Sequence, residues 1–397
     1  MLLCVCRANC AALCFATGVF LGAAVSTAQA QWTVTRLHPA GAAFSFANGA
    51  GPGCQVGRVG VGNNPSHASL WSGSADSWID LHPVGSTSST AYGADKNQQV
   101  GFASVSGLPH ASLWSGTAAS WVDLNPAGAS TSDAYGVSAG QQAGRATFSG
   151  QRRAGLWTGS AASWVDLHPS GASASECRGV GHGQQAGFAT FSGQRHASLW
   201  TGTAASWVEL HPKGATASEC YGVSEGQQVG SATIDGVFHA SLWSGSAESW
   251  VDLHPAGASS SFALAVHAGY QVGSVNHGGL VHASVWSGTV ESRVDLHAFL
   301  PAEFTGSSWA NGVWTDGVYL YVVGDSVNST TNRSEALLWT RPLCPADFDG
   351  DGFITGLDYD LYVQAFEGGD VSADFDGDGF ITGVDFDLYV QAFETGC

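Results

Sequence analysis

The chain has 397 residues, enough for two domains or one large repeat architecture, and only 11% of them are charged. Its net charge of −19, from 32 acidic and 13 basic residues, argues against a nucleic-acid partner, because phosphate binding needs a basic face. The high glycine count (54) and the 11% of aromatic residues argue against a disordered acidic chain and favour short strands joined by tight turns. Residues 344–397 hold 13 acidic and no basic residues, so much of the charge lies in the tail and the rest of the chain is nearly neutral.

Residues 1–30 have the pattern of a secretory signal peptide. Arg7 precedes an apolar run that ends near Val25, and residues 28–30 (Ala-Gln-Ala) have the small side chains of a cleavage site. We therefore expect a secreted or cell-surface protein whose mature chain begins at Gln31; an uncleaved membrane anchor is the alternative. No other stretch reaches the roughly 18 apolar residues of a membrane span, so we expect none after cleavage.

The body of the chain, residues 31–341, consists of repeats 43 residues long. The string HASLW, or a close variant, begins at His67, His110, Arg153, His196, His239 and His282, with a degenerate copy at Glu335. Each repeat contains four strand-like pieces separated by Gly, Ser, Asn and Pro, and it lacks the apolar stripe of a helix. Four short strands in about 40–45 residues are typical of one blade of a β-propeller.

The number of blades follows from the position that begins each first strand. This position occurs seven times, at Ala47, Ala91, Ala134, Cys177, Cys220, Ala263 and Ala310. The seventh unit lacks a fourth strand, and residues 32–39 at the N-terminus match one. We predict an all-β fold, a seven-bladed propeller that the N-terminal strand closes, because closure hides the sheet edges. An eight-bladed or open arrangement is the alternative, and we expect the propeller to be monomeric.

The repeat pattern, HASLW followed by SWVDLHP, resembles the HAF-type extracellular repeat. The third place, Phe in that family, is serine in most copies here. These serines are Ser69, Ser112, Ser198, Ser241 and Ser284. The resemblance implies a fold and an extracellular location but no reaction.

Tryptophan and histidine recur at fixed places in the repeat. A catalytic group is needed once, whereas these side chains occur in nearly every blade. We therefore expect the tryptophans to fill the space between blades, and the histidines to form hydrogen-bonded braces with a repeated acid, as His110 with Asp123. Ligand or metal binding is the alternative. Cys177 and Cys220 occupy equivalent places in adjacent blades; pairing and free thiols remain open, as does the state of Cys54.

The tail, residues 342–397, contains a twelve-residue acidic loop twice, 27 residues apart. Each loop has carboxylates at positions 1, 3, 5 and 12 and glycine at position 6, the spacing of an EF-type calcium loop. Such close carboxylates repel one another unless a cation lies among them. We predict two Ca²⁺ ions. The predicted ligands are Asp347, Asp349, Asp351, Phe353 (by its carbonyl), Thr355 and Asp358 in the first loop, and Asp374, Asp376, Asp378, Phe380, Thr382 and Asp385 in the second.

A short helix is expected after each loop, over 358–366 and 385–393. The predicted apolar faces are Leu361, Tyr362, Ala365 and Phe366 in the first helix, and Leu388, Tyr389, Ala392 and Phe393 in the second. A module of this size has little core, and Cys344 and Cys397 bracket it, so a disulfide between them would close the whole unit.

The two loop–helix units, the Cys-Pro-Ala-Asp-Phe start and the terminal Gly-Cys resemble a GC-type dockerin module over residues 344–397. The resemblance implies attachment to a cohesin-like or other cell-surface anchoring protein. Positions 10 and 11, often Ser-Thr in cellulosomal dockerins, are Gly356-Leu357 and Gly383-Val384 here, which puts ordinary cohesin binding in doubt.

The HExxH signature does not occur in the sequence, and GxSxG occurs only at residues 136–140 and 222–226, both at one place of the repeat. The repeat is broken at few places. These are Asn125, Arg153, Arg178, His267, His277, Asn311, Asp316 and Asp325. We therefore expect a secreted, non-enzymatic binding or scaffold protein that the calcium-dependent tail anchors. The alternatives are a lectin-like propeller with a glycan ligand and, less favoured, a polysaccharide-degrading enzyme.

Overall fold

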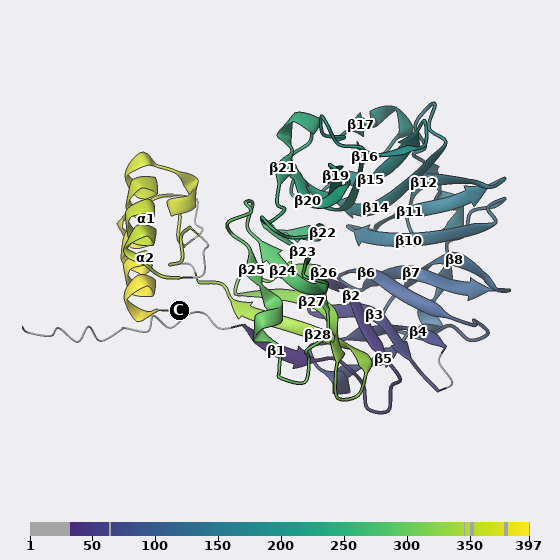
Figure 1. The fold of residues 1–397 in the computed structure, drawn as a ribbon, viewed down its shortest axis with the longest axis horizontal. Coiled ribbons are helices and arrows are strands. Elements are labelled where there is room, and N and C mark those ends of the chain that lie inside the picture. Colours follow the sequence, from purple (N-terminus) through teal and green to yellow (C-terminus); the bar gives the residue numbers. More distant parts are fainter. Residues whose placement is uncertain (1–31, 63–64, 345, 350–352, 377–379, 397) are drawn as a thin grey trace, which may run out of the picture.

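The computed structural model describes residues 32–62, 65–344, 346–349, 353–376 and 380–396. In this part of the chain the strands form seven antiparallel sheets of four strands each, arranged as the blades of a propeller (Figure 1). The prediction of seven blades is confirmed. The signal-peptide prediction for residues 1–30 lies outside the described residues.

Blades 1 to 6 are each built from four consecutive strands, ordered from the channel to the outer edge, and blade 7 takes its outermost strand from the N-terminus. Blade 1 comprises β2 (Ser45–Gly51), β3 (Cys54–Gly60), β4 (Ser66–Trp71) and β5 (Ile79–Asp80). Blade 2 comprises β6 (Ser89–Asp95), β7 (Gln98–Val105), β8 (Leu108–Trp114) and β9 (Val122–Asp123). Blade 3 comprises β10 (Thr131–Ser138), β11 (Gln141–Phe148), β12 (Gln151–Trp157) and β13 (Val165–Asp166). Blade 4 comprises β14 (Ala174–Gly181), β15 (Gln184–Phe191), β16 (Gln194–Trp200) and β17 (Val208–Glu209).

The remaining blades follow the same order. Blade 5 comprises β18 (Ala217–Ser224), β19 (Gln227–Ile234), β20 (Val237–Trp243) and β21 (Val251–Asp252). Blade 6 comprises β22 (Ser260–His267), β23 (Tyr270–His277), β24 (Leu280–Trp286) and β25 (Val294–Asp295). Blade 7 comprises β26 (Ser308–Thr315), β27 (Tyr319–Asn328), β28 (Arg333–Pro342) and β1 (Thr33–Arg36). Short 3₁₀ helices are η1 (Ala75–Ser77), η2 (Ala118–Ser120), η3 (Ala161–Ser163), η4 (Ala204–Ser206), η5 (Ala247–Ser249), η6 (Leu296–Phe299) and η7 (Val371–Ala373).

Strand β1 closes the ring. It pairs with β28 in antiparallel register from Thr33 opposite Thr340 to Arg36 opposite Leu337, and it becomes the outermost strand of blade 7. The first and last strands of the propeller are therefore joined by hydrogen bonds, as the sequence predicted. This pairing covers the edge that β28 would otherwise expose.

The core lies between the blades rather than within them. Trp157 of blade 3, for example, is fully buried and packs with Val100, Leu113 and Leu124 of blade 2. The tryptophans at this place in all seven blades have no exposed surface, which confirms the prediction that they fill the space between sheets. They are Trp71, Trp114, Trp157, Trp200, Trp243, Trp286 and Trp339.

Glycine lets the innermost strands come close together. A Cβ on Gly49 would lie 2.5 Å from the carbonyl oxygen of Tyr92 in the next blade, and one on Gly179 would lie 3.0 Å from Gly222 Cα. Larger residues at these places would push neighbouring blades apart, so the glycines set the narrow inner diameter of the ring.

Hydrogen bonds join each blade to the next. In blade 1 His67 Nδ1 donates to Asp80 Oδ2 at 2.7 Å, and its ring stacks on His82 at 4.0 Å. His82 bonds Ser89 Oγ of blade 2 at 2.8 Å, and the same oxygen accepts the backbone N–H of Ala68. The predicted brace is confirmed in the five blades that have this histidine, and in blade 3 Arg153 takes its place at 2.9 Å from Asp166.

The C-terminal module consists of two acidic loops and two helices, α1 (Gly356–Gly368) and α2 (Gly383–Thr395), which lie side by side (Figure 1). Its centre is a parallel stack of Tyr362 and Tyr389, both fully buried with ring centroids 3.7 Å apart. Each tyrosine hydroxyl donates to the carbonyl just before the opposite loop, Tyr362 to Ala373 and Tyr389 to Ala346. The helices thus position each other's loops.

The predicted helix faces are partly wrong. Tyr359 and Phe386 pack into the module core, whereas Leu361 and Leu388 do not belong to it, and Leu388 is exposed. Each helix turns the face with Tyr359 or Phe386 toward its partner because the large stacked aromatic rings bury more surface there. Among the described residues, neither helix of this module nor any other is long and apolar enough to cross a membrane.

Candidate metal centre and propeller channel

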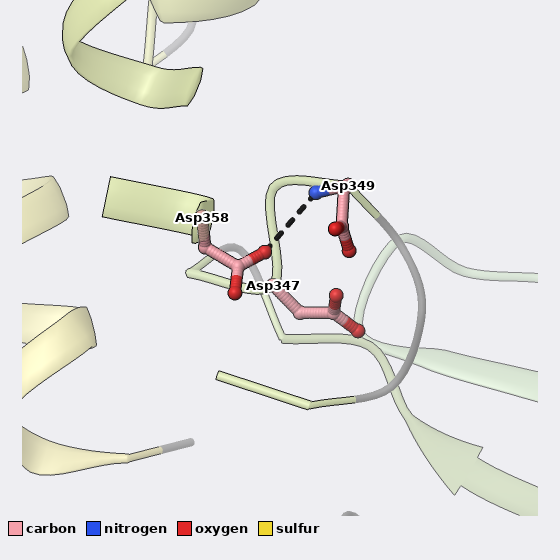
Figure 2. A group of neighbouring side chains, drawn as sticks. All are labelled: Asp347, Asp349 and Asp358. Carbon is pink, nitrogen blue, oxygen red and sulfur yellow. Dashed lines mark hydrogen bonds between the residues drawn. The ribbon is translucent and has the colours of Figure 1, made fainter. Parts of the chain in front are cut away.

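Three carboxylates converge in the first acidic loop. Ligand oxygens of Asp347, Asp349 and Asp358 all lie within 4.8 Å of one another (Figure 2). Asp358 is fully buried; its Oδ1 accepts the N–H groups of Phe348 (2.8 Å) and Asp349 (3.2 Å). Its Oδ2 accepts from the backbone and hydroxyl of Thr355, the residue that caps α1. One side chain therefore ties the start of the loop to the start of the helix.

The second loop repeats this arrangement almost atom for atom. Asp374, Asp376 and Asp385 converge within the same distance, and buried Asp385 accepts from Phe375, Asp376 and Thr382. The backbone N–H of Thr382 makes the largest contribution in lowering the pKa of Asp385 below its ordinary value. The carboxylate is therefore charged at neutral pH, the form that binds a cation.

The other predicted ligands are placed as follows. Phe353, Thr355, Phe380 and Thr382 lie within the described part of the loops, and both threonine hydroxyls accept a helix N–H as caps. Asp351 and Asp378 lie outside the described residues. The disulfide between Cys344 and Cys397 stays a prediction because Cys397 is also outside them. Oxygen-rich loops of this kind suit hard divalent cations.

The propeller has a cavity of about 900 Å³ at one end of its channel. Each innermost strand has a β-bulge, a one-residue shift in its pairing with the second strand. A bulge re-aims the extra side chain. The seven residues at the shifts line the cavity, and we call them the bulge ring. The bulge ring consists of Asn48, Tyr92, Tyr135, Arg178, Tyr221, Leu264 and Asn311.

The bulge ring was missed in the sequence, although Arg178 and Asn311 had been noted as departures from the repeat. The feature of the sequence that could have indicated these residues is the variation at this position between copies of the repeat. The buried tryptophan is the same in every blade, whereas the bulge position holds four different residue types. Arg178 is the only arginine or lysine among the described residues that line the cavity.

Asp325 lies behind the bulge ring in blade 7. It is almost fully buried; its Oδ1 accepts from Asn311 Nδ2 at 3.1 Å, and burial raises its pKa to about 7. The carboxyl is therefore able to hold a proton near neutral pH. Of the departures from the repeat in blade 7, Asp325 is the one that lies next to the bulge ring and has a raised pKa.

The repeated histidines and the free cysteines have structural surroundings. Burial is the main cause that lowers the pKa of His82, and its stacked neighbour His67 lowers it further. Cys177 and Cys220 are fully buried free thiols rather than a disulfide, and burial raises the pKa of both. Cys54 is also a buried free thiol, with a pKa raised to about 11. Thiols held protonated in this way are poor nucleophiles.

The chain is thus a seven-bladed β-propeller followed by a small helical module with two acidic loops. No family model matches it, and no curated protein sequence is similar to it. The HAF-type and dockerin resemblances therefore stay predictions.

Solved structures similar to the chain include two hydrolases and a lyase. A puromycin hydrolase mutant complexed with PGG has a TM-score of 0.52 at 12% identity, over 73% of this chain and 53% of its own. A puromycin-hydrolysing peptidase of Mycobacterium tuberculosis has a TM-score of 0.50 at 13% identity, over 78% and 53%. An oligogalacturonate lyase of Vibrio parahaemolyticus has a TM-score of 0.50 at 8% identity, over 79% and 94%. The chain spans about half the length of the first two.

The prediction of a non-enzymatic binding or scaffold protein is contradicted by these neighbours, which are two hydrolases and a lyase. Sequence motifs in the repeats were a poor guide, because a propeller channel collects single residues from different blades. At identities this low the likeness itself shows the fold alone. The lectin-like alternative stays a prediction. The tryptophans at the HASLW position are fully buried, whereas those at the SWVD position are partly exposed.

Proposed function

We propose that residues 344–397 form a module that binds two Ca²⁺ ions and attaches the propeller to a partner protein. The observation that carries the proposal is the convergence of three carboxylates in each loop, around a buried aspartate that the backbone holds in place. At an effective dielectric constant of 20, two charges 4 Å apart repel by about 4 kcal/mol. A divalent cation turns this repulsion into attraction.

Calcium fits the loops better than magnesium. Ca²⁺ accepts six to eight oxygen ligands in flexible geometry, whereas Mg²⁺ demands near-ideal octahedral sites and keeps its waters. Extracellular calcium modules work with Kd values on the order of 10⁻⁴–10⁻³ M. The signal-peptide pattern of residues 1–30 agrees with an exported protein that meets calcium at such concentrations.

The surface of the module supports a role in attachment. Leu357 and Val384, equivalent residues at the starts of α1 and α2, are 55% and 56% exposed. Because the loops precede these residues directly, their position depends on loop structure and hence on the cation. The apolar pair lies in a module without basic residues, so a partner with an apolar site and a basic rim would suit it. A cohesin-like protein is the first partner to test.

Isothermal titration of the mature chain with CaCl₂ tests metal binding. We expect two sites, and Asp349→Asn and Asp376→Asn should each weaken one site at least tenfold. Asp360→Asn and Asp387→Asn are matched controls, because these exposed acids lie on the helices outside the carboxylate groups, and they should change nothing. Equal effects of all four variants, or no binding heat, would contradict the calcium site.

A pull-down with the mature chain tests attachment. Retention by an immobilised cohesin-like domain or an extract of the source organism should occur in Ca²⁺ and be lost in EDTA. The double variant Leu357→Asp/Val384→Asp should also abolish it, whereas Val371→Asp, at an 80% exposed site away from both helix starts, should not. Retention that changes neither on removal of calcium nor in the double variant would show that this surface does not bind the partner.

A further inference from the structure

The innermost strands of the propeller differ in charge from one side of the ring to the other. Two residues before each bulge, three successive blades place acids, which are Asp133, Glu176 and Glu219. At the same place blades 6, 7 and 1 have Phe262, Trp309 and Phe46. We call these sets the charged arc and the aromatic arc. The packing of the blades does not require this difference between the two arcs, because the buried tryptophan between the blades is the same in all of them.

Arginines link the members of the charged arc. Arg145 reaches Asp133 at 2.9 Å and Glu176 at 3.1 Å, and Arg195 reaches Glu219 at 2.6 Å. Arg178 lies between them, 3.0 Å from Glu176 and 3.9 Å from Glu219. Each acid of the charged arc is therefore in contact with at least one arginine other than Arg178.

Aromatic rings hold Arg178 in one orientation. Its guanidinium carbon lies 5.8 Å from the centre of the Tyr135 ring, 5.3 Å from that of Tyr221 and 5.7 Å from that of Phe188. The side chain remains 34% exposed and lines the channel cavity. A guanidinium that is positioned in advance, half dehydrated and open to the cavity is a suitable receptor for an anionic group.

Tyrosine hydroxyls add donors beside it. Within the described part of the chain, the hydroxyls of Tyr92 and Tyr135 make no hydrogen bond, although Tyr221 bonds Ser231. Both rings belong to the bulge ring next to Arg178, with centroids 5.4 Å apart. Their hydroxyls are therefore available to a ligand in the cavity.

An apolar side cavity of about 210 Å³ adjoins the channel on the opposite side, between blades 6 and 7. Phe262 and Leu264 line both cavities, so the two share a wall, and Val281 and Trp309 complete the apolar part of the smaller one. In blades 2 and 4 the place of Ser274 is taken by Phe102 and Phe188. In blade 6 the small side chain of Ser274 leaves room for the side cavity.

We infer that the channel mouth binds a small organic anion that carries an apolar group. Arg178 receives the carboxylate or phosphate, Tyr92 and Tyr135 donate to it, and the apolar group enters the side cavity beside Ser274. This site is independent of the calcium module. Each acid of the charged arc has another arginine partner, so the acids do not require Arg178, the one arginine of this network that lines the cavity.

The repeat itself supplies the variants that test the site. Arg178→Tyr introduces the residue that blades 2, 3 and 5 have in the bulge ring. Ser274→Phe introduces the residue of blades 2 and 4 and fills the side cavity. Arg195→Phe, copied from Phe238 of blade 5, removes one positive charge from the same network but lies outside the cavity lining, so it is the matched control.

The probes are four aromatic acids: benzoate, phenylacetate, 3-phenylpropionate and 4-phenylbutyrate. Two compounds serve as controls: 3-phenylpropanol has the ring but no charge, and propionate has the charge but no ring. Affinities are measured by titration calorimetry and ligand-observed NMR on the mature chain, and circular dichroism confirms folding of each variant. We expect at least one aromatic acid to bind ten times more tightly than both matched compounds. Arg178→Tyr and Ser274→Phe should each weaken it at least tenfold, and Arg195→Phe should not.

The same series with 2-phenylethyl phosphate separates the two sources of the anion. Tighter binding of the phosphate assigns a phosphate ester, and tighter binding of the acid assigns a carboxylate; either supports an anionic ligand. Equal binding of the alcohol, an affinity unaffected by Arg178→Tyr in a folded variant, or no binding by any probe would overturn the inference.

Discussion

The propeller and the C-terminal module are stabilised in opposite ways. The propeller repeats one core between blades, with a fully buried tryptophan in each, and its 19 acidic and 12 basic residues partly balance. The module has one small aromatic core and 13 acids without a base. We expect the propeller to depend on its repeated core and the small acidic module to depend on a bound ion. The chain would then have two separate sources of stability.

The largest expected effect concerns the propeller core. Trp114→Ala removes a fully buried ring that packs against Val56, Leu70 and Leu81 of blade 1, and such changes cost about 3–5 kcal/mol. Trp121→Ala is the control, because this ring is only half-buried at the edge of the same cluster and should cost less. Denaturant unfolding followed by tryptophan fluorescence measures both. Equal losses would show that packing between blades is not the main source of stability.

Removal of calcium should affect the module alone. At a free calcium concentration one hundred times Kd, each bound ion stabilises the folded module by about 2.7 kcal/mol. Scanning calorimetry in EDTA should therefore lower or abolish the module transition and leave the propeller transition in place. A propeller transition that moves with calcium, or a module transition that does not, would break the division between the two regions.

Lowering the pH should reduce the free energy of unfolding by a smaller amount, and the loss should come from the propeller. Burial lowers the pKa of His82, His211, His254 and His297 in the folded chain, so the unfolded chain binds protons more readily. The contribution to stability is complete above the unfolded pKa of about 6.5 and is lost as the pH falls below it.

A variant taken from the chain itself isolates this effect. His254→Asn copies Asn125 of blade 2, which accepts a hydrogen bond from Ser132 at 2.7 Å and does not titrate. Unfolding free energies measured between pH 7.5 and 5 should fall less steeply in this variant than in the parent. An unchanged slope would show that these histidines do not govern the acid response.

Much of the architecture could be predicted because it is periodic. The 43-residue step, the seven first-strand positions and the fourth-strand match at residues 32–39 indicate the blades and the closing strand, and both are present. The Asp-Gly spacing in the tail placed its carboxylates close together, since loop ligands are set by local sequence. The neighbouring helices were expected as well, but not their inward faces.

Local sequence thus determined the elements, the blade count and the acidic loops, because each depends on residues close together in the chain. Tertiary structure decided which helix face is buried, where Tyr359 and Phe386 replaced the leucines, since only the partner helix defines an inside. It also created the channel site. Arg178, Tyr92 and the side cavity beside Ser274 belong to three blades, and only bulges and closure of the ring bring residues so distant in sequence around one cavity.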